Sequence, residues 1–245
     1  MQLHISHSCK TPIVLPVNYH HILQGIVYNS LAHGQPQGTC LAESLHDNTE
    51  GLKREYKFFQ FSEISGHYSF YNRKLTFDNT MSWEIRTPDR HIIMAIKRGI
   101  EENGIKYGDI EVDNVRVELT DNTIEFDEIC IRMSTPICVY STDPETKKTY
   151  FYSPDEDEFY EGMCDNFVRK YEAYSGNVPN GTIEIEPLNV FQKDKYVTKY
   201  KGFYISGWRG EYILRGNRKY IDFLYQTGLG AKNSQGFGMF NVIEP

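Results

Sequence analysis

One order of strands and helices occurs twice along this chain of 245 residues. In the first half, apolar–polar alternation predicts strands, while capping residues and apolar spacing predict helices. Asn18 and Thr87 are the predicted helix caps, Pro88 occupies a first helical position, and Gly104 ends that helix, with Gly66 near a strand turn. We expect elements at 2–8 (strand), 18–31 (helix), 58–64 and 68–77 (strands), 87–104 (helix), 110–119 and 124–133 (strands).

The second half follows the same order. We expect strands at 129–140 and 149–152, a helix from Ser153 and Pro154 to 174, strands at 182–191, 196–200 and 202–214, a helix at 218–227 and a strand at 237–242. Strand–helix–strand–strand–helix–strand (βαββαβ, or RRM-like) is the ferredoxin-like pattern. The sequence therefore predicts an α+β fold of tandem ferredoxin-like domains, residues 1–130 and 131–245.

The composition indicates a folded protein that has neither a membrane span nor a metal centre. Hydrophobic residues make up 40% of the chain and aromatic residues 14%, which is ample for a core. The sequence has no run of about 18 apolar residues, and its start alternates like a strand rather than a signal peptide. Because the five cysteines form no CxxC pair, we expect reduced thiols in the cytoplasm, no zinc and no cofactor.

Charge is distributed unevenly. The net charge is −7, but residues 192–245 carry nine Lys and Arg against four acidic residues, so this part is +5 and the first 191 residues are −12. A basic patch on an acidic body can still bind phosphates locally by releasing counterions. A solvated hairpin explains the lysines at 193–201 equally well.

The basic part also contains a glycine-rich segment, Gly228-Leu-Gly-Ala-Lys-Asn-Ser-Gln-Gly-Phe-Gly-Met-Phe240. Glycine permits positive φ and close backbone approach, so amide groups can line an anion site. A dinucleotide-binding motif needs a following helix and an acidic residue about 20 positions on, but only five residues follow Phe240. A Walker loop would end in Gly-Lys-Ser/Thr, which is missing. The segment therefore suits the backbone of an extended phosphodiester, or it is a tight structural turn.

This segment resembles the C-terminal glycine-rich signature of the RAMP superfamily. It is more closely similar to that of the CRISPR-associated endoribonucleases that cut repeat RNA (pre-crRNA) into guide RNAs. A second stretch, Leu15-Pro-Val-Asn-Tyr-His-His-Ile-Leu-Gln-Gly-Ile-Val-Tyr-Asn-Ser30, is similar to the first helix of that family. The resemblance implies tandem ferredoxin-like domains and crRNA maturation in antiviral defence. Its implied partners are CRISPR repeat RNA and a multisubunit effector complex, for a monomer or a homodimer.

The resemblance also implies a catalytic set of Tyr28, His46 and Lys57. Family members carry a Tyr late in the first helix, a His in the following segment and a Lys before the next strand. Lys53 is a weaker candidate than Lys57, and His33 is the alternative histidine, followed by His20 and His21. Histidine suits proton transfer near neutral pH. The implied reaction is metal-independent attack by the 2′-hydroxyl, with His46 as general acid or base and Lys57 stabilising negative charge.

The predicted RNA contacts lie in the last part of the chain, where they must face the same RNA as the first-half site. They are Gly228, Gly230, Lys232, Asn233, Ser234, Gly236, Gly238, Arg209, Arg215, Arg218 and Lys219. Trp208 and Tyr212 are further candidates, as stacking platforms for bases. Two alternatives remain open. One is a non-catalytic RAMP protein that binds guide RNA in an effector complex, and the other is a general RNA-binding module, although the chain lacks an RNP1 motif.

Overall fold

The computed structural model describes residues 1–34, 56–200 and 202–244, which form helices and antiparallel sheets. The chain packs into two units. The first comprises Met1–Lys57 and Phe61–Asn122, and the second comprises Phe58–Gln60 and Thr123–Pro245. Within the second unit, the Gln60 side-chain amide donates to the carbonyl oxygen of Tyr225 at 2.8 Å. Three residues from the first half of the chain are therefore built into the second unit.

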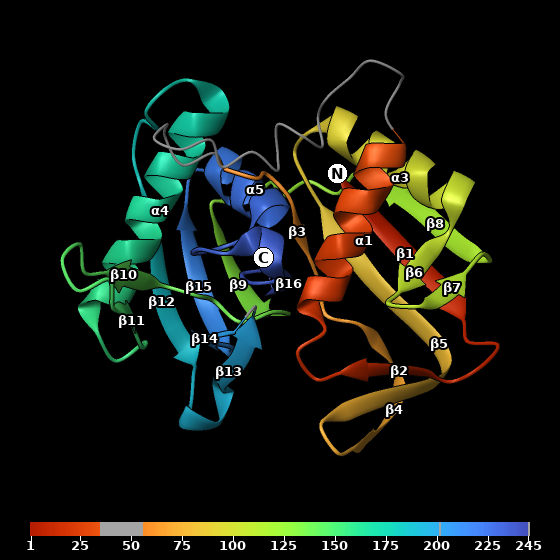
Figure 1. Ribbon diagram of the computed structural model, residues 1–245. Helices are drawn as coiled ribbons and strands as arrows, with labels where there is room; N and C mark the ends of the chain where they lie inside the picture. Colours follow the sequence, from red (N-terminus) through yellow and green to blue (C-terminus); the bar gives the residue numbers. More distant parts are fainter. Residues whose placement is uncertain (35–55, 201, 245) are drawn as a thin grey trace. The chain divides into compact units, whose positions relative to one another are not determined.

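The sheet of the first unit has the strand order β2-β5-β1-β8, and β4 pairs with β5. Helices α1 and α3 lie side by side against it (Figure 1). Apolar residues of β1, such as Leu3 and Ile5, are fully buried and alternate with exposed His4, as the period of a strand requires. The elements are β1 Gln2–Ser8, β2 Ile13–Pro16, α1 His20–His33, β3 Gln60–Phe61, β4 Ser65–Tyr71, β5 Lys74–Arg86, α3 Arg90–Asn103, β6 Ile105–Tyr107, β7 Ile110–Val112 and β8 Val115–Thr120.

Both helices of the first unit begin later than the sequence predicted. Asp89, rather than Thr87, caps α3, because its carboxylate accepts from the backbone amides of His91 and Ile92. The predicted end at Gly104 is confirmed, and its φ is 65°. The N-cap of α1 is Tyr19, so Asn18 does not cap this helix.

The strand predicted at 68–77 is instead a hairpin. Asn72 and Arg73 both have positive φ, 47° and 58°, and they form the turn between β4 and β5. Two consecutive left-handed residues match the twist of a two-residue hairpin turn. Gly66 therefore lies within β4 and not at the turn.

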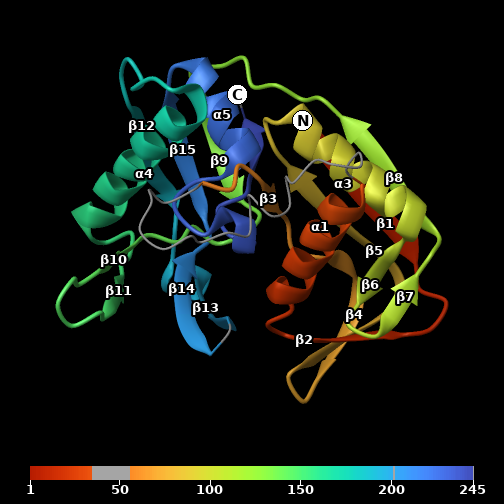
Figure 2. The same cartoon turned by 45° about the horizontal axis from the view of Figure 1, so that its top comes forward.

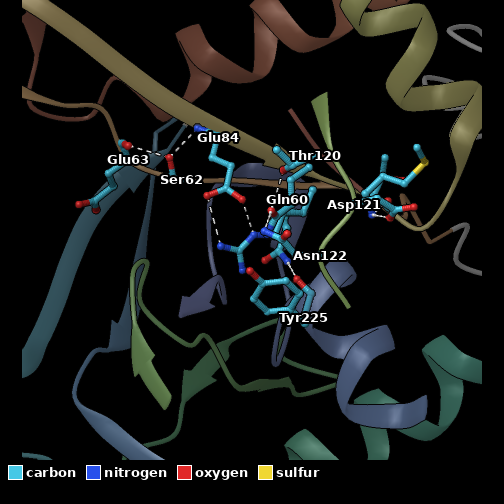
Figure 3. A network of polar contacts seen from close by, with 12 residues as sticks. Gln60, Ser62, Glu63, Glu84, Thr120, Asp121, Asn122 and Tyr225 are labelled. Atoms are coloured by element: carbon cyan, nitrogen blue, oxygen red, sulfur yellow. Dashed lines mark hydrogen bonds and ion pairs between the residues drawn. The ribbon is translucent and has the colours of Figure 1, made fainter. Parts of the chain in front are cut away.

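Polar side chains bind the end of β5 to its neighbours (Figure 3). The Arg86 guanidinium, only 2% exposed, donates to both carboxylate oxygens of Glu84, at 2.6 and 3.2 Å. The backbone amide of Glu84 in turn donates to Ser62 Oγ at 2.9 Å. A buried charge is tolerated only when it is paired and hydrogen-bonded, as Arg86 is here.

The second unit has the sheet order β12-β15-β9-β16, and α4 and α5 lie on one face of that sheet in both views (Figures 1 and 2). Its elements are β9 Glu128–Met133, β10 Tyr140–Thr142, β11 Thr149–Phe151, α4 Asp157–Ser175, β12 Ile183–Asn189, β13 Lys195–Tyr200, β14 Phe203–Trp208, β15 Glu211–Gly216, α5 Arg218–Thr227 and β16 Phe240–Glu244. A core formed by Ile131, Phe159, Phe167, Tyr212 and Phe240 lies between helices and sheet.

Two predictions from the sequence differ from the structure of the second unit. The predicted domain boundary at 130/131 falls inside β9, which pairs with β15 and β16 of the second unit. The predicted helix start at Ser153 and Pro154 is also early, since α4 begins at Asp157. The helix expected at 218–227 has the observed bounds, because Asn217 caps it by accepting from the amide of Lys219 at 3.0 Å. None of the helices among the described residues could span a membrane.

Candidate functional site

Tyr28 and Lys57 lie together in the first unit. The apolar stripe of α1, which includes Leu23, Val27 and Leu31, packs into the core and brings Tyr28 with it, so that the tyrosine is 9% exposed. The Lys57 ammonium lies 5.0 Å from the centre of the Tyr28 ring. A cation at this distance from an aromatic face is attracted to it. Two of the three predicted catalytic residues are thus in contact, across 29 positions of sequence.

The third predicted residue, His46, lies outside the described residues, as does Lys53. Among the alternatives, His20 is buried, 3.7 Å from a Glu63 carboxylate oxygen and edge-on to the Phe61 ring. His21 and His33 are exposed on α1, and each bonds through Nδ1 to a backbone carbonyl, at 2.9 and 2.8 Å. His20 therefore contributes to the core of the unit, whereas the ring of His33 remains accessible to solvent.

The glycine-rich segment, residues 228–238, is a folded loop between α5 and β16. Gly228, Gly230, Gly236 and Gly238 all have positive φ, from 62° to 88°. A Cβ on Gly238 would lie 2.0 Å from the carbonyl oxygen of Leu229. Glycine is therefore required here by backbone conformation and by the close approach of the two ends of the loop.

Most of the amides expected to bind phosphate are already used. The amides of three glycines donate to carbonyl oxygens of the second unit: Gly228 to Leu224 at 2.6 Å, Gly236 to Asn233 at 3.0 Å, and Gly238 to Pro136 at 2.9 Å. The prediction that these glycines offer bare N–H groups is therefore wrong. Each amide has one hydrogen to donate, and here internal acceptors take it.

Asn233 and the buried Lys170 lie at the centre of the loop. The Asn233 carboxamide nitrogen donates to the carbonyl oxygens of Leu229 and Phe237, both at 3.0 Å. Lys170 Nζ, from α4, donates to the carbonyl oxygen of Gly228 at 2.5 Å and to Asn233 Oδ1 at 3.1 Å. Burial lowers the pKa of Lys170 to about 7, because a low-dielectric environment disfavours the charged form. Asn233 is thus a structural residue of the loop and is 8% exposed.

Sequence reasoning missed Lys170, although a signal was present. Phe159, Met163 and Phe167 are the buried face of α4, and Lys170 follows them at the next position of that face. A lysine at a core-facing position of a helix needs a buried hydrogen-bond acceptor for its amine. The acceptors are 58 and 63 residues away in sequence, so their identity could not be read from local spacing.

Lys232 and Ser234 occupy the outer part of the loop. Both are half-buried. Lys232 has a left-handed backbone, with φ of 63°, and its ammonium lies 4.7 Å from the centre of the Tyr140 ring. The loop therefore presents one cation beside an aromatic ring, in place of the predicted row of amides.

The four predicted arginine and lysine contacts outside the loop have different environments. Arg215 forms ion pairs with Glu128 and Glu186, both at 2.7 Å, which raise its pKa. Arg209 packs 5.1 Å from the Tyr196 ring centre and donates to the carbonyl oxygen of Ser134. Arg218 and Lys219 begin α5 and line a shallow depression of about 310 Å³ with acidic Glu125 and Asp222. Because two carboxylates neutralise Arg215, it is not one of the RNA contacts that we propose.

The two predicted stacking platforms are buried. Trp208 is 3% exposed and Tyr212 is 0% exposed, so neither ring face is available to a base. Exposed aromatic rings are found instead on β14, where Phe203 is 78% and Tyr204 is 70% exposed. Lys199 of β13 lies 5.8 Å from the Tyr204 ring centre. The cluster of lysine and aromatic residues at 195–204 is the sequence signal that could have pointed to them.

None of the described parts of the chain gathers three or more His, Cys, Asp or Glu side chains in a group that could hold a metal ion. The side chains of Tyr28 and Lys57 offer a phenol and an ammonium. Those groups can donate hydrogen bonds and stabilise negative charge on a substrate.

Known proteins are similar to this chain in sequence and in fold. A CRISPR-associated endoribonuclease Cas6 of Methanocaldococcus jannaschii is 26% identical over 237 residues, covering 94% of this chain and 88% of the relative. A solved structure of a Cas6-related gene from Pyrococcus furiosus has a TM-score of 0.82 at 21% identity and covers 100% of this chain and 98% of that one. A RAMP protein binding different RNA substrates has a TM-score of 0.81 at 21% identity, with 100% of both chains covered.

The model of the family described as CRISPR associated protein Cas6, C-terminal, matches residues 119–242. That span contains the glycine-rich loop, Lys170 and most of the second unit. It is half of the chain, and the Methanocaldococcus relative extends the similarity over most of the remainder. This chain belongs to the CRISPR-associated Cas6 family.

Proposed function

We propose that this protein is an endoribonuclease that cleaves CRISPR repeat RNA and so produces guide RNAs for antiviral defence. Relatives that cover most of the chain are named CRISPR-associated endoribonucleases. The observation that carries the proposal is the contact of Lys57 with Tyr28, because it joins the two described members of the implied catalytic set.

The chemistry that we propose uses a nucleophile from the RNA itself. The 2′-hydroxyl attacks the adjacent phosphorus, the bond to the 5′-oxygen breaks, and the products carry a 2′,3′-cyclic phosphate and a 5′-hydroxyl. One proton leaves the 2′-hydroxyl and one is delivered to the departing 5′-oxygen, so an acid and a base suffice. We assign one of these transfers to His46 and the other to Tyr28, without a metal ion.

The position of Lys57 supports its proposed role as the group that stabilises the phosphorane. Negative charge builds on the nonbridging oxygens in the transition state, and a fixed ammonium stabilises that charge more than the charge of the ground state. Tyr28 lies on α1, and Lys57 lies three residues before β3.

We propose that RNA runs along the basic surface of the second unit. Lys232 and Ser234 would contact phosphates at the loop, with Arg209, Arg218 and Lys219 extending the positive track. Phe203 and Tyr204 would stack on unpaired bases, since stacking on exposed rings tolerates any base. The sequence-level excess of +5 over residues 192–245 supports this path.

We infer that each unit is a ferredoxin-like domain. The first unit contains β1, α1, β4, β5, α3 and β8, and the second contains β9, α4, β12, β15, α5 and β16. In each sheet the first and third main strands are central neighbours, and the last strand lies beside the first, namely β5-β1-β8 and β15-β9-β16. A helix follows the first strand and another precedes the last, which supports two copies of one plan.

The proposal is tested with purified protein and labelled host repeat RNA in excess EDTA. We expect one cut that leaves a cyclic phosphate. Replacing the single 2′-hydroxyl upstream of the cut by hydrogen should abolish cleavage and leave the Kd within about twofold, because only the nucleophile is missing.

Three results would contradict parts of this proposal. Tight binding without any cut would favour the alternative, a RAMP protein that holds guide RNA within an effector complex. Cleavage that requires added metal would exclude the metal-independent reaction. Equal cutting of the deoxy substrate would exclude attack by the 2′-hydroxyl.

A further inference from the structure

Lys170 is a buried side chain that neither the proposed reaction nor the proposed RNA contacts use. It is 3% exposed, and both of its hydrogen-bond acceptors are neutral groups of the glycine-rich loop, namely the Gly228 carbonyl oxygen and Asn233 Oδ1. An apolar residue would continue the buried face formed by Met163 and Phe167 without desolvating an amine. The lysine therefore calls for an explanation beyond core packing.

Through these two acceptors Lys170 is connected to both ends of the loop. Gly228 is the first loop residue, and Asn233 donates onward to Leu229 and to Phe237, both at 3.0 Å. The Lys170 amine, the Asn233 side-chain oxygen and the Asn233 side-chain nitrogen thus tie the first residues of the loop to Phe237 near its end. The carboxamide can do this only while it keeps the orientation in which its oxygen faces Lys170.

The protonation chemistry of the amine is compatible with this arrangement. A neutral amine carries two N–H donors, and Lys170 has two acceptors in reach, at 2.5 and 3.1 Å. Burial lowers its pKa to about 7, so the neutral form is accessible near physiological pH. The contact to the loop does not depend on the charge, because either form supplies both donors.

The loop segment between these anchors carries Lys232 and Ser234. Lys232 has a left-handed backbone conformation, which a lysine adopts only where its surroundings impose it. Its neighbour Asn233 is the residue that Lys170 holds. Lys232, whose ammonium lies beside Tyr140, is thus the sequence neighbour of a residue that a buried amine from α4 binds.

We propose that Lys170 is a positioning residue for RNA binding: its amine fixes the Asn233 carboxamide and the Gly228 carbonyl, and so holds Lys232 in the orientation that meets the RNA backbone. This inference rests on the proposed contact between the loop and RNA. Lys170 itself does not touch the RNA.

The test is the Lys170→Met variant, which keeps the length of the side chain and removes both donors. We expect the Kd for repeat RNA to rise about tenfold, which corresponds to the loss of one well-oriented contact. At saturating protein, the single-turnover cleavage rate should stay within about twofold, since the residues that react are unchanged. The Tm at neutral pH should change little, because the loss of two donors to buried acceptors opposes the gain from removing a buried amine.

Hydrogen exchange gives a second readout, which tests whether Lys170 holds the loop; the difference between the Kd and the cleavage rate tests whether that matters for RNA. The amides of Leu229 and Gly238 donate within the loop region, so their exchange should accelerate in Lys170→Met, while amides of β9 and β15 keep wild-type rates. Arg169→Met is the matched control: it removes a neighbouring positive charge on α4, where Arg169 is exposed, and should leave loop exchange unchanged.

Lys232→Ala separates failure of the inference from failure of the proposed function. Weaker RNA binding in Lys232→Ala together with wild-type binding in Lys170→Met would overturn the positioning role alone. If neither variant weakens binding, the proposed contact between loop and RNA is wrong, and the positioning role falls with it.

If Lys170→Met does not fold, the wild-type protein still decides the question. NMR of protein labelled with ¹⁵N at lysine Nζ should show the buried Lys170 resonance shifting when repeat RNA binds. The reason is that Lys170 is hydrogen-bonded to the loop whose Lys232 is proposed to contact the RNA. A Lys170 resonance that stays unchanged at saturating RNA would overturn the proposal.

Discussion

The Lys57 ammonium lies 5.0 Å from the centre of the Tyr28 ring. Lysine is usually a surface residue, but here it packs against a tyrosine on the buried face of α1. This contact separates two properties of Tyr28 that mutation can distinguish. The ring attracts the lysine, and the hydroxyl is the group to which we assign a proton transfer.

Tyr28→Phe should therefore keep Lys57 in place and lose the reaction. We expect the single-turnover rate to fall about 100-fold, as removal of a general acid or base does, with the Kd for repeat RNA within about twofold. Tyr19→Phe is the matched control. Its hydroxyl accepts from the amide of Ile64 at 3.0 Å, so it should lower the free energy of unfolding by about 1 kcal/mol and leave the rate unchanged. A Tyr28→Phe enzyme with the wild-type rate would remove the hydroxyl from the mechanism.

Lys57→Ala tests the proposed stabilisation of the phosphorane. Loss of one preorganised donor typically slows a reaction about 100-fold or more, and we expect that size of effect on the single-turnover rate. Lys57→Arg should recover part of the rate, because it restores the positive charge with a different geometry. Equal rates for the alanine variant and the wild type would contradict the role.

His46→Ala should bind repeat RNA almost normally and cut it about 100-fold more slowly, because a proton transfer is lost. The comparison is His33→Ala, which changes the exposed alternative histidine at the end of α1. If His33→Ala is the slow variant and His46→Ala cuts at the wild-type rate, the assignment of the histidine is reversed. The pH–rate profile of the slow variant should lose the limb that histidine titration gives to the wild type.

Glycines of this chain should respond to alanine in opposite directions. Gly238→Ala places a Cβ 2.0 Å from the Leu229 carbonyl oxygen at a φ of 82°, so it should lower the free energy of unfolding by about 2 kcal/mol or more. Gly25 lies within α1, and a Cβ there meets nothing within 4 Å. Gly25→Ala should raise stability by about 0.5–1 kcal/mol. Urea denaturation measures both, and equal effects would contradict the packing described for the loop.

Stability should depend on pH through Lys170. Its pKa is about 7 in the folded protein against an ordinary 10.5, so between these values the unfolded chain binds a proton that the folded chain does not. The free energy of unfolding therefore rises with pH across this window, and the group weakens the fold most below pH 7. Lys170→Met lacks this contribution. The wild type should gain stability relative to the variant between pH 7 and 9, and a constant difference would contradict the lowered pKa.

Local sequence signals predicted the elements whose ends are decided locally. The α5 helix has the predicted bounds, and Asn217 caps it through its own side chain. Gly104 ends α3 as expected. The prediction from Thr87 and Pro88 was wrong because Thr87 Oγ1 accepts from the amide of Asp89, and Asp89 in turn caps the helix by accepting from the amides of His91 and Ile92. The hairpin turn at Asn72 and Arg73 was not predicted, because arginine rarely adopts the left-handed conformation that this turn requires.

The candidate site was predictable where it rested on a motif and unpredictable where it rested on distant partners. The first-helix motif led to Tyr28, and the segment before β3 led to Lys57. The glycine spacing located the loop, but not the internal carbonyls that occupy its amides. Burial of Trp208 and Tyr212 likewise depends on the packing of the second unit, which no local pattern records.

Residues 58–60 belong to the second unit, while the chain on both sides of them belongs to the first. A single cut after Asn122 would therefore give a C-terminal fragment without the Gln60 amide that bonds to the Tyr225 carbonyl. The second unit cannot be exchanged as one continuous stretch of sequence. A chimera that takes residues 123–245 from a relative must take the residues equivalent to 58–60 as well. Lys57 is joined to the segment by one peptide bond, so the same exchange would also change the residue next to a proposed catalytic side chain.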